Sequence, residues 1–155
     1  MRPSTTFDNT SLYHHTETGR MLIDATRTLS DELVRRLEKS QYEFLVEARQ
    51  VDLATLADDL KSQVRGGWFG DLKVADVSTI GMFGPTVGES AEWGTYEQVG
   101  ALSVIDLESE IDGLRLPVKI MANRGVVLYQ SFSEAQTLSL LLGLQDVLDE
   151  YEIDE

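Results

Sequence analysis

The feature that most constrains the fold is a sharp change in glycine and proline content along the chain. Between Met21 and Arg65 there is neither Gly nor Pro, whereas eight of the twelve glycines fall between Gly70 and Gly125. Because Gly and Pro interrupt helices and mark turns, the first stretch is expected to be helical. The second stretch, which is also rich in β-branched residues, is expected to form short strands joined by turns.

Residues 21–65 are predicted to form one long helix or two helices. Thr28 or Ser30 can cap the first, whose apolar stripe contains Leu29, Leu33, Val34 and Leu37. Asp52 can cap the second, whose apolar residues recur along one helix face: Leu53, Leu56, Ala57, Leu60 and Val64. Gly66 and Gly67 are expected to end this helix. Residues 42–47 also alternate as a strand would, and this alternative stays open.

The glycine-rich stretch offers four candidate strands, at residues 72–77, 101–107, 116–121 and 126–132. Residues 122–125 form a candidate hairpin turn in which Gly125 supplies a positive φ. Ser133 and Gln136 form a capping box ahead of a helix that runs to about Tyr151. The predicted fold is therefore α+β: an N-terminal helical segment, a small antiparallel sheet of about four strands, and a C-terminal amphipathic helix.

The length of 155 residues favours one domain. We expect an extended N-terminal arm over 1–20, a single α+β domain over 21–155, and an acidic tail over 146–155 that frays from the last helix. The sequence has no apolar run long enough to cross a membrane and no apolar signal core near Met1. A soluble protein, intracellular or within a particle and without a signal peptide, is expected.

The formal net charge of -14 is unevenly distributed. Residues 1–65 carry nine Lys or Arg against eleven Asp or Glu, whereas residues 66–155 carry four against sixteen. Such a negative field repels nucleic-acid backbones and anionic lipids, so direct binding to either is disfavoured. It favours a basic partner or cations. The sequence contains no Cys, which excludes disulfides and Cys-based zinc sites.

The most regular polar pattern is a row of acids at alternate positions: Asp106, Glu108, Glu110 and Asp112. On a strand these four carboxylates share one face, where they could bind a divalent cation or a basic partner. The spacing does not fit an EF-hand loop, because Ile111 and Pro117 occupy the Gly and Glu positions of that loop. A solvent-facing strand face is the more common origin of such alternation, and no metal or cofactor is assigned.

Two aromatic segments are candidate partner-binding sites. Trp68 and Phe69 lie between glycines, and Met82 and Phe83 lie in a glycine-rich segment that we interpret as a loop. Exposed Trp side chains are enriched in interface hot spots, although burial of one or both rings of the first pair is the more common arrangement. The glycine-rich segment is not a phosphate-binding loop, because Glu89 stands where such a loop requires Lys.

Catalytic groups are scarce in the sequence. Both histidines, His14 and His15, lie in the predicted arm, and adjacent histidines point in different directions on a helix or a strand. A Ser-His-Asp set would require the arm to fold back onto the domain. No catalytic residue is therefore assigned.

We predict a non-enzymatic protein-binding or assembly subunit, forming a homo-oligomer or part of a larger complex. The small size, the polar arm and the glycine-punctuated strands are of a type found in minor structural proteins of phage virions, and no motif assigns the chain to a family. Two alternatives stay open. One is an acidic mimic of nucleic acid that inhibits a DNA- or RNA-binding protein. The other is a metal-dependent hydrolase that uses the acidic strand.

Overall fold

The computed structural model describes residues 11–24, 27–39, 49–74, 76–111 and 113–153. The chain divides into two compact units, residues 1–47 and 48–155, and each is described by itself. In the first unit, β1 (Ser11–His15) and β2 (Arg20–Asp24) form an antiparallel hairpin, and α1 (Arg27–Glu38) follows. The turn of this hairpin is closed by a hydrogen bond from the Gly19 N–H to the His15 carbonyl, at 2.8 Å.

The predicted helical segment over residues 21–65 is wrong for much of its length. Strand β2 occupies its start, and after α1 the described chain resumes with β3 (Gln50–Val51), α2 (Leu53–Asp59) and a short 3-10 turn, η1 (Lys61–Gln63). The predicted Asp52 cap is confirmed, since its side chain accepts a hydrogen bond from the Thr55 N–H. A stretch without Gly and Pro permits strands as well as helices, so their absence alone does not select the helix. The alternative strand at 42–47 lies outside the described residues.

Gly66 and Gly67 do not end a helix but lie inside strand β4 (Val64–Gly70). The reason is steric. A Cβ on Gly67 would lie 2.6 Å from Cη2 of Trp93 and 3.0 Å from the Val104 carbonyl oxygen. The glycine is therefore needed because an aromatic ring packs directly against the strand backbone.

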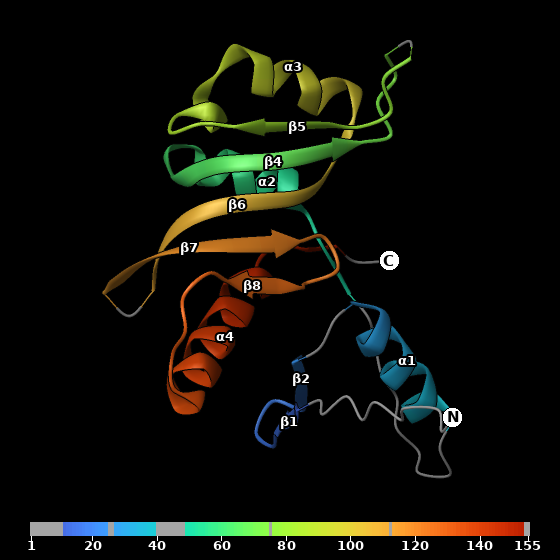
Figure 1. Cartoon of the computed structure of the whole chain (residues 1–155), viewed down its shortest axis with the longest axis vertical. Coiled ribbons are helices and arrows are strands. Elements are labelled where there is room, and N and C mark those ends of the chain that lie inside the picture. Colours follow the sequence, from blue (N-terminus) through green and yellow to red (C-terminus); the bar gives the residue numbers. More distant parts are fainter. Residues whose placement is uncertain (1–10, 25–26, 40–48, 75, 112, 154–155) are drawn as a thin grey trace, which may run out of the picture. The chain divides into compact units, whose positions relative to one another are not determined.

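The second unit is built on a five-stranded antiparallel sheet with strand order β5-β4-β6-β7-β8, which Figure 1 shows from the top downward. The strands after β4 are β5 (Ile80–Phe83), β6 (Ala101–Ile111), β7 (Leu114–Met121) and β8 (Val126–Leu128). The sequence predicted about four strands. Its first candidate, residues 72–77, is not one of them, because Asp71 at φ 48° turns the chain out of β4. Instead β5 forms in the segment interpreted as a loop.

Two further helices belong to the second unit. Helix α3 (Ala91–Val99) was not predicted; its cap is Ser90, whose Oγ accepts from the Trp93 N–H at 3.2 Å. Helix α4 (Glu134–Asp149) confirms the predicted C-terminal helix, and the capping box of Ser133 and Gln136 is present. The fold is therefore a mixed α+β arrangement. After α4, β9 (Glu152–Ile153) pairs with β3. None of the helices in the described residues is long and apolar enough to cross a bilayer.

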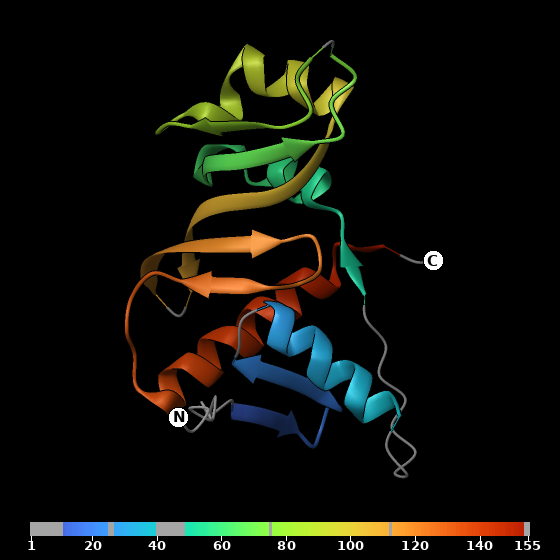
Figure 2. The ribbon, with the colours of Figure 1, turned by 45° about the vertical axis from the view of Figure 1, so that its right-hand side comes forward.

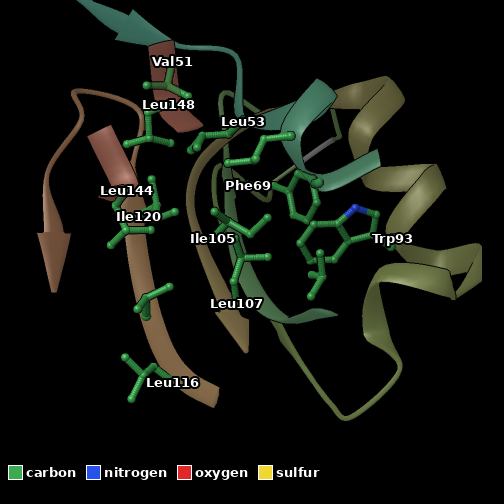
Figure 3. Close-up of a cluster of buried hydrophobic side chains, with 14 of the residues drawn as sticks. Val51, Leu53, Phe69, Trp93, Ile105, Leu107, Leu116, Ile120, Leu144 and Leu148 are labelled. Atoms are coloured by element: carbon green, nitrogen blue, oxygen red, sulfur yellow. The ribbon is translucent and has the colours of Figure 1, made fainter. Parts of the chain in front are cut away.

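One face of the sheet carries the hydrophobic core. Figure 3 shows Phe69 of β4 beside Trp93 of α3, with ring centroids 4.8 Å apart and nearly perpendicular planes. Towards β7, Ile120 lies near Leu144 and Leu148 of α4 in the same view. Helix α2 contributes its buried stripe to this cluster: Leu53, Leu56 and Ala57. Helices α2, α3 and α4 therefore all contribute side chains to the core on this face.

The β7–β8 hairpin is fastened to α4 by an arginine in an unusual backbone conformation. The residue with positive φ in this turn is Arg124, at 68°, and not Gly125 as the sequence suggested. Its guanidinium donates to Gln145 Oε1 at 2.9 Å, to the Gln145 carbonyl at 3.0 Å and to Asp149 Oδ1 at 2.7 Å. It also lies 3.8 Å from Glu152 Oε2. These contacts use the acids of the predicted tail to hold the end of α4 against the sheet.

Candidate interaction surface on the open face of the sheet

The face of the sheet opposite the core is the candidate functional site, and we call it the open face. Successive strand residues point to opposite faces, and residues paired across antiparallel strands share a face. Ile105 and Leu107 of β6 are buried in the core, so Asp106 and Glu108 point to the open face. Figure 2, turned by 45° from Figure 1, shows the five strands that carry this face. Its described side chains are Arg65, Trp68, Phe83, Val104, Asp106, Glu108, Glu110, Arg115, Pro117, Lys119, Met121, Val127 and Tyr129.

The aromatic end of the open face is a stacked pair formed by Trp68 of β4 and Phe83 of β5. Their ring centroids lie 5.8 Å apart with an interplanar angle of 71°, the edge-to-face geometry that aromatic pairs favour. The pair remains open to solvent: Trp68 is 41% exposed and Phe83 is 59% exposed. Two large rings packed on each other and still exposed form a patch rather than isolated surface residues.

Two glycines make room for this pair on the sheet. Gly66 pairs with Phe83 across the strands, and Gly81 pairs with Trp68. A Cβ on Gly66 would lie 2.3 Å from Cδ1 of Phe83, and a Cβ on Gly81 would lie 3.0 Å from atoms of both rings. The rings therefore lie over backbone that carries no side chain, which holds them close to the sheet surface.

The acidic row of β6 lies on the open face beside this pair, and each described acid has a basic residue next to it. Glu108 forms an ion pair with Arg65, whose Nη2 is 2.9 Å from Glu108 Oε2. Asp106 is paired in register with Lys119 of β7, and Glu110 with Arg115. The fourth acid, Asp112, lies outside the described residues. The described row is therefore a mixed-charge surface and not a continuous negative one.

A polar cluster at the centre of the open face connects three strands. The Tyr129 hydroxyl, just beyond β8, donates to Asp106 Oδ1 at 3.1 Å. The Lys119 ammonium lies 5.9 Å from the centroid of the Tyr129 ring. A hydrogen bond with Tyr129 raises the pKa of Lys119, and the nearby Asp106 raises it further. Tyr129 and Asp106 therefore stabilise the charged form of the Lys119 side chain.

The eight residues singled out in the sequence are only partly brought together. Trp68, Phe83 and three of the acids meet on the open face. Phe69 is fully buried beneath Trp93 and Tyr96, and Met82 points to the core side, where it packs partly buried against the core cluster. Sequence reasoning missed the basic and phenolic members of the surface, namely Arg65, Arg115, Lys119 and Tyr129. The predicted turn at residues 122–125 could have indicated that β7 and β8 pair, and the Asp112-Gly113 dipeptide, a common hairpin sequence, could have indicated that β7 pairs with β6.

The rest of the described structure offers no organised reaction centre. Within the residues that the structure describes, no group of three or more His, Asp or Glu side chains is placed to hold a metal ion. The imidazole of His15 is hydrogen-bonded to the Thr18 hydroxyl, with Nδ1 and Oγ1 2.7 Å apart. A shallow hollow of about 300 Å³ lies between β3, the start of α2 and the start of β6, and its only ionisable side chains are Asp52 and Glu97.

The Asp52 carboxylate in this hollow has a structural role, because it caps α2. Hydrogen bonds from the Thr55 side chain and backbone lower the pKa of Asp52, so it is ionised at neutral pH and serves as an acceptor. The open face is therefore the most developed surface feature in the described residues. A comparison of the chain with protein-family models, with curated proteins and with solved structures finds no match.

Proposed function

We propose that the protein is a non-enzymatic interaction or assembly subunit that binds a protein partner through the open face. The observation that carries the proposal is the exposed Trp68–Phe83 pair, held against the sheet by Gly66 and Gly81. Trp is among the residues most enriched in interface hot spots, and a pre-positioned ring loses little side-chain entropy when a partner covers it. A role as a minor structural component of a larger particle, such as a phage virion, is one form of this proposal.

The surroundings of the pair also suit a protein interface. Interfaces combine an apolar centre with a polar rim. Here Val104 lies opposite Trp68 in register, and Asp106, opposite Gly66, is the next residue of β6 on the same face. An apolar centre with hydrogen-bonding groups at its edge favours a specific partner surface over general adhesion.

The two alternative functions receive less support from this geometry. A mimic of nucleic acid requires rows of carboxylates with few cations among them, and the described acids of β6 alternate with Arg65, Lys119 and Arg115. A hydrolase that uses a metal on the acidic strand requires several converging oxygens, whereas the Glu108 and Asp106 carboxylates are engaged by Arg65 and Tyr129. We therefore retain the interaction function as the single candidate.

The test is affinity capture with the full chain, followed by identification of the bound protein and measurement of its affinity with both components purified. The variants Trp68→Ser and Phe83→Ser remove the aromatic pair, and Val147→Ser on α4 is the control, because Val147 is similarly exposed at 45%. Removal of a hot-spot residue costs about 2 kcal/mol or more, so affinity should fall about 30-fold in the first two variants and hardly change in the third. Equal binding by all three variants would rule out the open face as the binding surface.

A further inference from the structure

We infer that the partner covering the open face is a second copy of this chain, docked sheet against sheet. The inference rests on the proposed function and specifies its partner. The open face differs in net charge from the unit that carries it. Residues 48–155 contain seven Lys or Arg against nineteen Asp or Glu, a net charge of -12. Among the residues that the structure describes, the open face instead carries three acids and three bases: Asp106, Glu108, Glu110, Arg65, Arg115 and Lys119.

The neutrality of the open face determines which partner fits it. Two chains of net charge -14 repel each other wherever their acidic surfaces meet. On the described part of the open face the charges sum to zero, so a second copy can approach there without meeting an excess of like charge. A basic partner would find no local excess of negative charge on the described part of this face, because most of the acids of this unit lie elsewhere. Charge complementarity therefore favours self-association at this surface over capture of a basic protein.

The mixed charges also allow the face to be complementary to itself. In a two-fold dimer the same patch meets itself in the opposite direction, so an acid of one copy can lie over a base of the other. Glu108 and Arg65 form an ion pair, and Asp106 and Lys119 lie opposite each other in register two residues earlier in β6. The exposed Trp68 and Phe83 rings supply the apolar centre that such a dimer buries.

The size of the surface predicts a reversible dimer. Five strands spaced about 4.8 Å apart, paired over about five residues of about 3.4 Å each on average, give a face of about 24 by 17 Å. Two such faces bury about 800 Å² in plan, which is below the standard interface size and suits a weak, transient contact. Aligned sheets pack about 10 Å apart, a distance that large side chains on both faces can fill. We expect association in the micromolar range rather than a permanent dimer.

Sedimentation equilibrium of the full chain between about 1 and 200 μM tests the inference. The mass should rise with concentration from 17.3 kDa towards twice that value. Trp68→Ser should weaken the dimer at least tenfold, and Val147→Ser should not. Lys119→Glu makes the face net negative and should also weaken the dimer at least tenfold. The control is Lys73→Glu in the loop after β4, which makes the same change in total charge and should have little effect on dimerisation. Thermal melts of each variant exclude loss of folding as the cause.

Salt separates a second copy from a basic partner. Added salt screens the repulsion between two acidic chains, so the dimer should strengthen between 50 and 300 mM NaCl, whereas a complex with a basic protein would weaken. A wild-type chain that stays at 17.3 kDa throughout would overturn the second-copy inference. The proposed function would still stand if Trp68→Ser abolished binding of an identified partner. A dimer whose dissociation constant changes with neither Trp68→Ser nor Lys119→Glu would also overturn the second-copy inference, because its interface would lie elsewhere.

Discussion

Two neighbouring glycines of β4 provide the sharpest test of how the two faces of the sheet differ. Gly66 faces the exposed Phe83 ring, and Gly67 faces the buried Trp93 ring, which is only 3% exposed. Substitution of either by Ala adds the same single methyl group. At Gly67 the new Cβ would lie 2.6 Å from Trp93 Cη2 and 3.0 Å from the Val104 carbonyl oxygen, and neither group can move without disturbing the core. We expect the free energy of unfolding to fall by about 1–3 kcal/mol, the usual cost of overpacking.

At Gly66 the expected result is different. The new Cβ would lie 2.3 Å from Phe83 Cδ1, but this ring is more than half exposed and can rotate away into solvent. Replacement of Gly by Ala also stabilises by about 0.4–1 kcal/mol through the unfolded chain, which offsets part of the strain. Gly66→Ala should therefore change the free energy of unfolding by less than about 1 kcal/mol while displacing the Phe83 ring from Trp68.

Urea denaturation monitored by tryptophan fluorescence measures both variants, because the chain has two tryptophans, one on each face. The Gly66→Ala variant should keep its stability and lose affinity for the partner of the open face. Gly67→Ala should lose stability. If Gly66→Ala were as destabilising as Gly67→Ala, the assignment of the two rings to an open and a core face would be wrong.

Three further predictions follow from contacts of the second unit. Arg124→Ala should lower the free energy of unfolding by about 1–3 kcal/mol because it removes the hydrogen bonds to Gln145 and Asp149. Arg124→Gly should lower it by about 1 kcal/mol less, because Gly accepts φ 68° without strain. Equal losses of stability for the two variants in urea denaturation would contradict the role of the backbone conformation. Asp52→Ala should cost about 1 kcal/mol at pH 7. The folded-state pKa of Asp52 lies below its ordinary value of 3.8, so the stabilisation is complete above that pH and is lost as the pH falls through the folded-state pKa. A difference from wild type that did not shrink as the pH fell below 3.8 would refute the capping role. Tyr129→Phe should lower the pKa of Lys119 in an NMR titration, since the hydrogen bond to Tyr129 is the main cause of its elevation.

The elements that could be predicted from the sequence are those set by local chemistry. The Ser133 capping box and the broad apolar surface behind it specify α4 without help from the rest of the chain, and Asp52 specifies the start of α2 in the same way. The alternation along β6 and β7 was also readable, because a strand with one buried face repeats every two residues.

The elements that could not be predicted depend on partners distant in the sequence. Gly66 and Gly67 are typical of a helix end, and only the rings of Phe83 and Trp93 explain why they lie in a strand. Strand β5 has a glycine-rich sequence that is typical of a loop, and it becomes a strand because β4 offers it a matching edge. Tertiary contacts therefore decided these elements against their local preference.

The candidate site could be predicted only in part, because it too combines residues that are distant in the sequence. The alternating acids could be assigned to one strand face, and the Asp112-Gly113 dipeptide between β6 and β7 is a hairpin signal that would have placed Lys119 opposite Asp106. The base beside Glu108 comes from β4, and no sequence spacing relates Arg65 to it. The three described acids of the row are therefore part of a surface on which the described charges balance. Likewise Phe69, adjacent to Trp68 in sequence, points to the opposite face and is buried.

The most direct test of the account is the solvent accessibility of Trp68 in the associated protein. Trp93 is buried, so quenching of the native fluorescence by acrylamide reports mainly on Trp68; a neutral quencher is needed because the acidic chain repels iodide. We predict that the quenchable fraction is large in dilute solution and falls sharply when the chain self-associates or binds its partner. A Trp68 that is quenched equally in the free and associated protein would contradict the claim that the open face is where this chain binds.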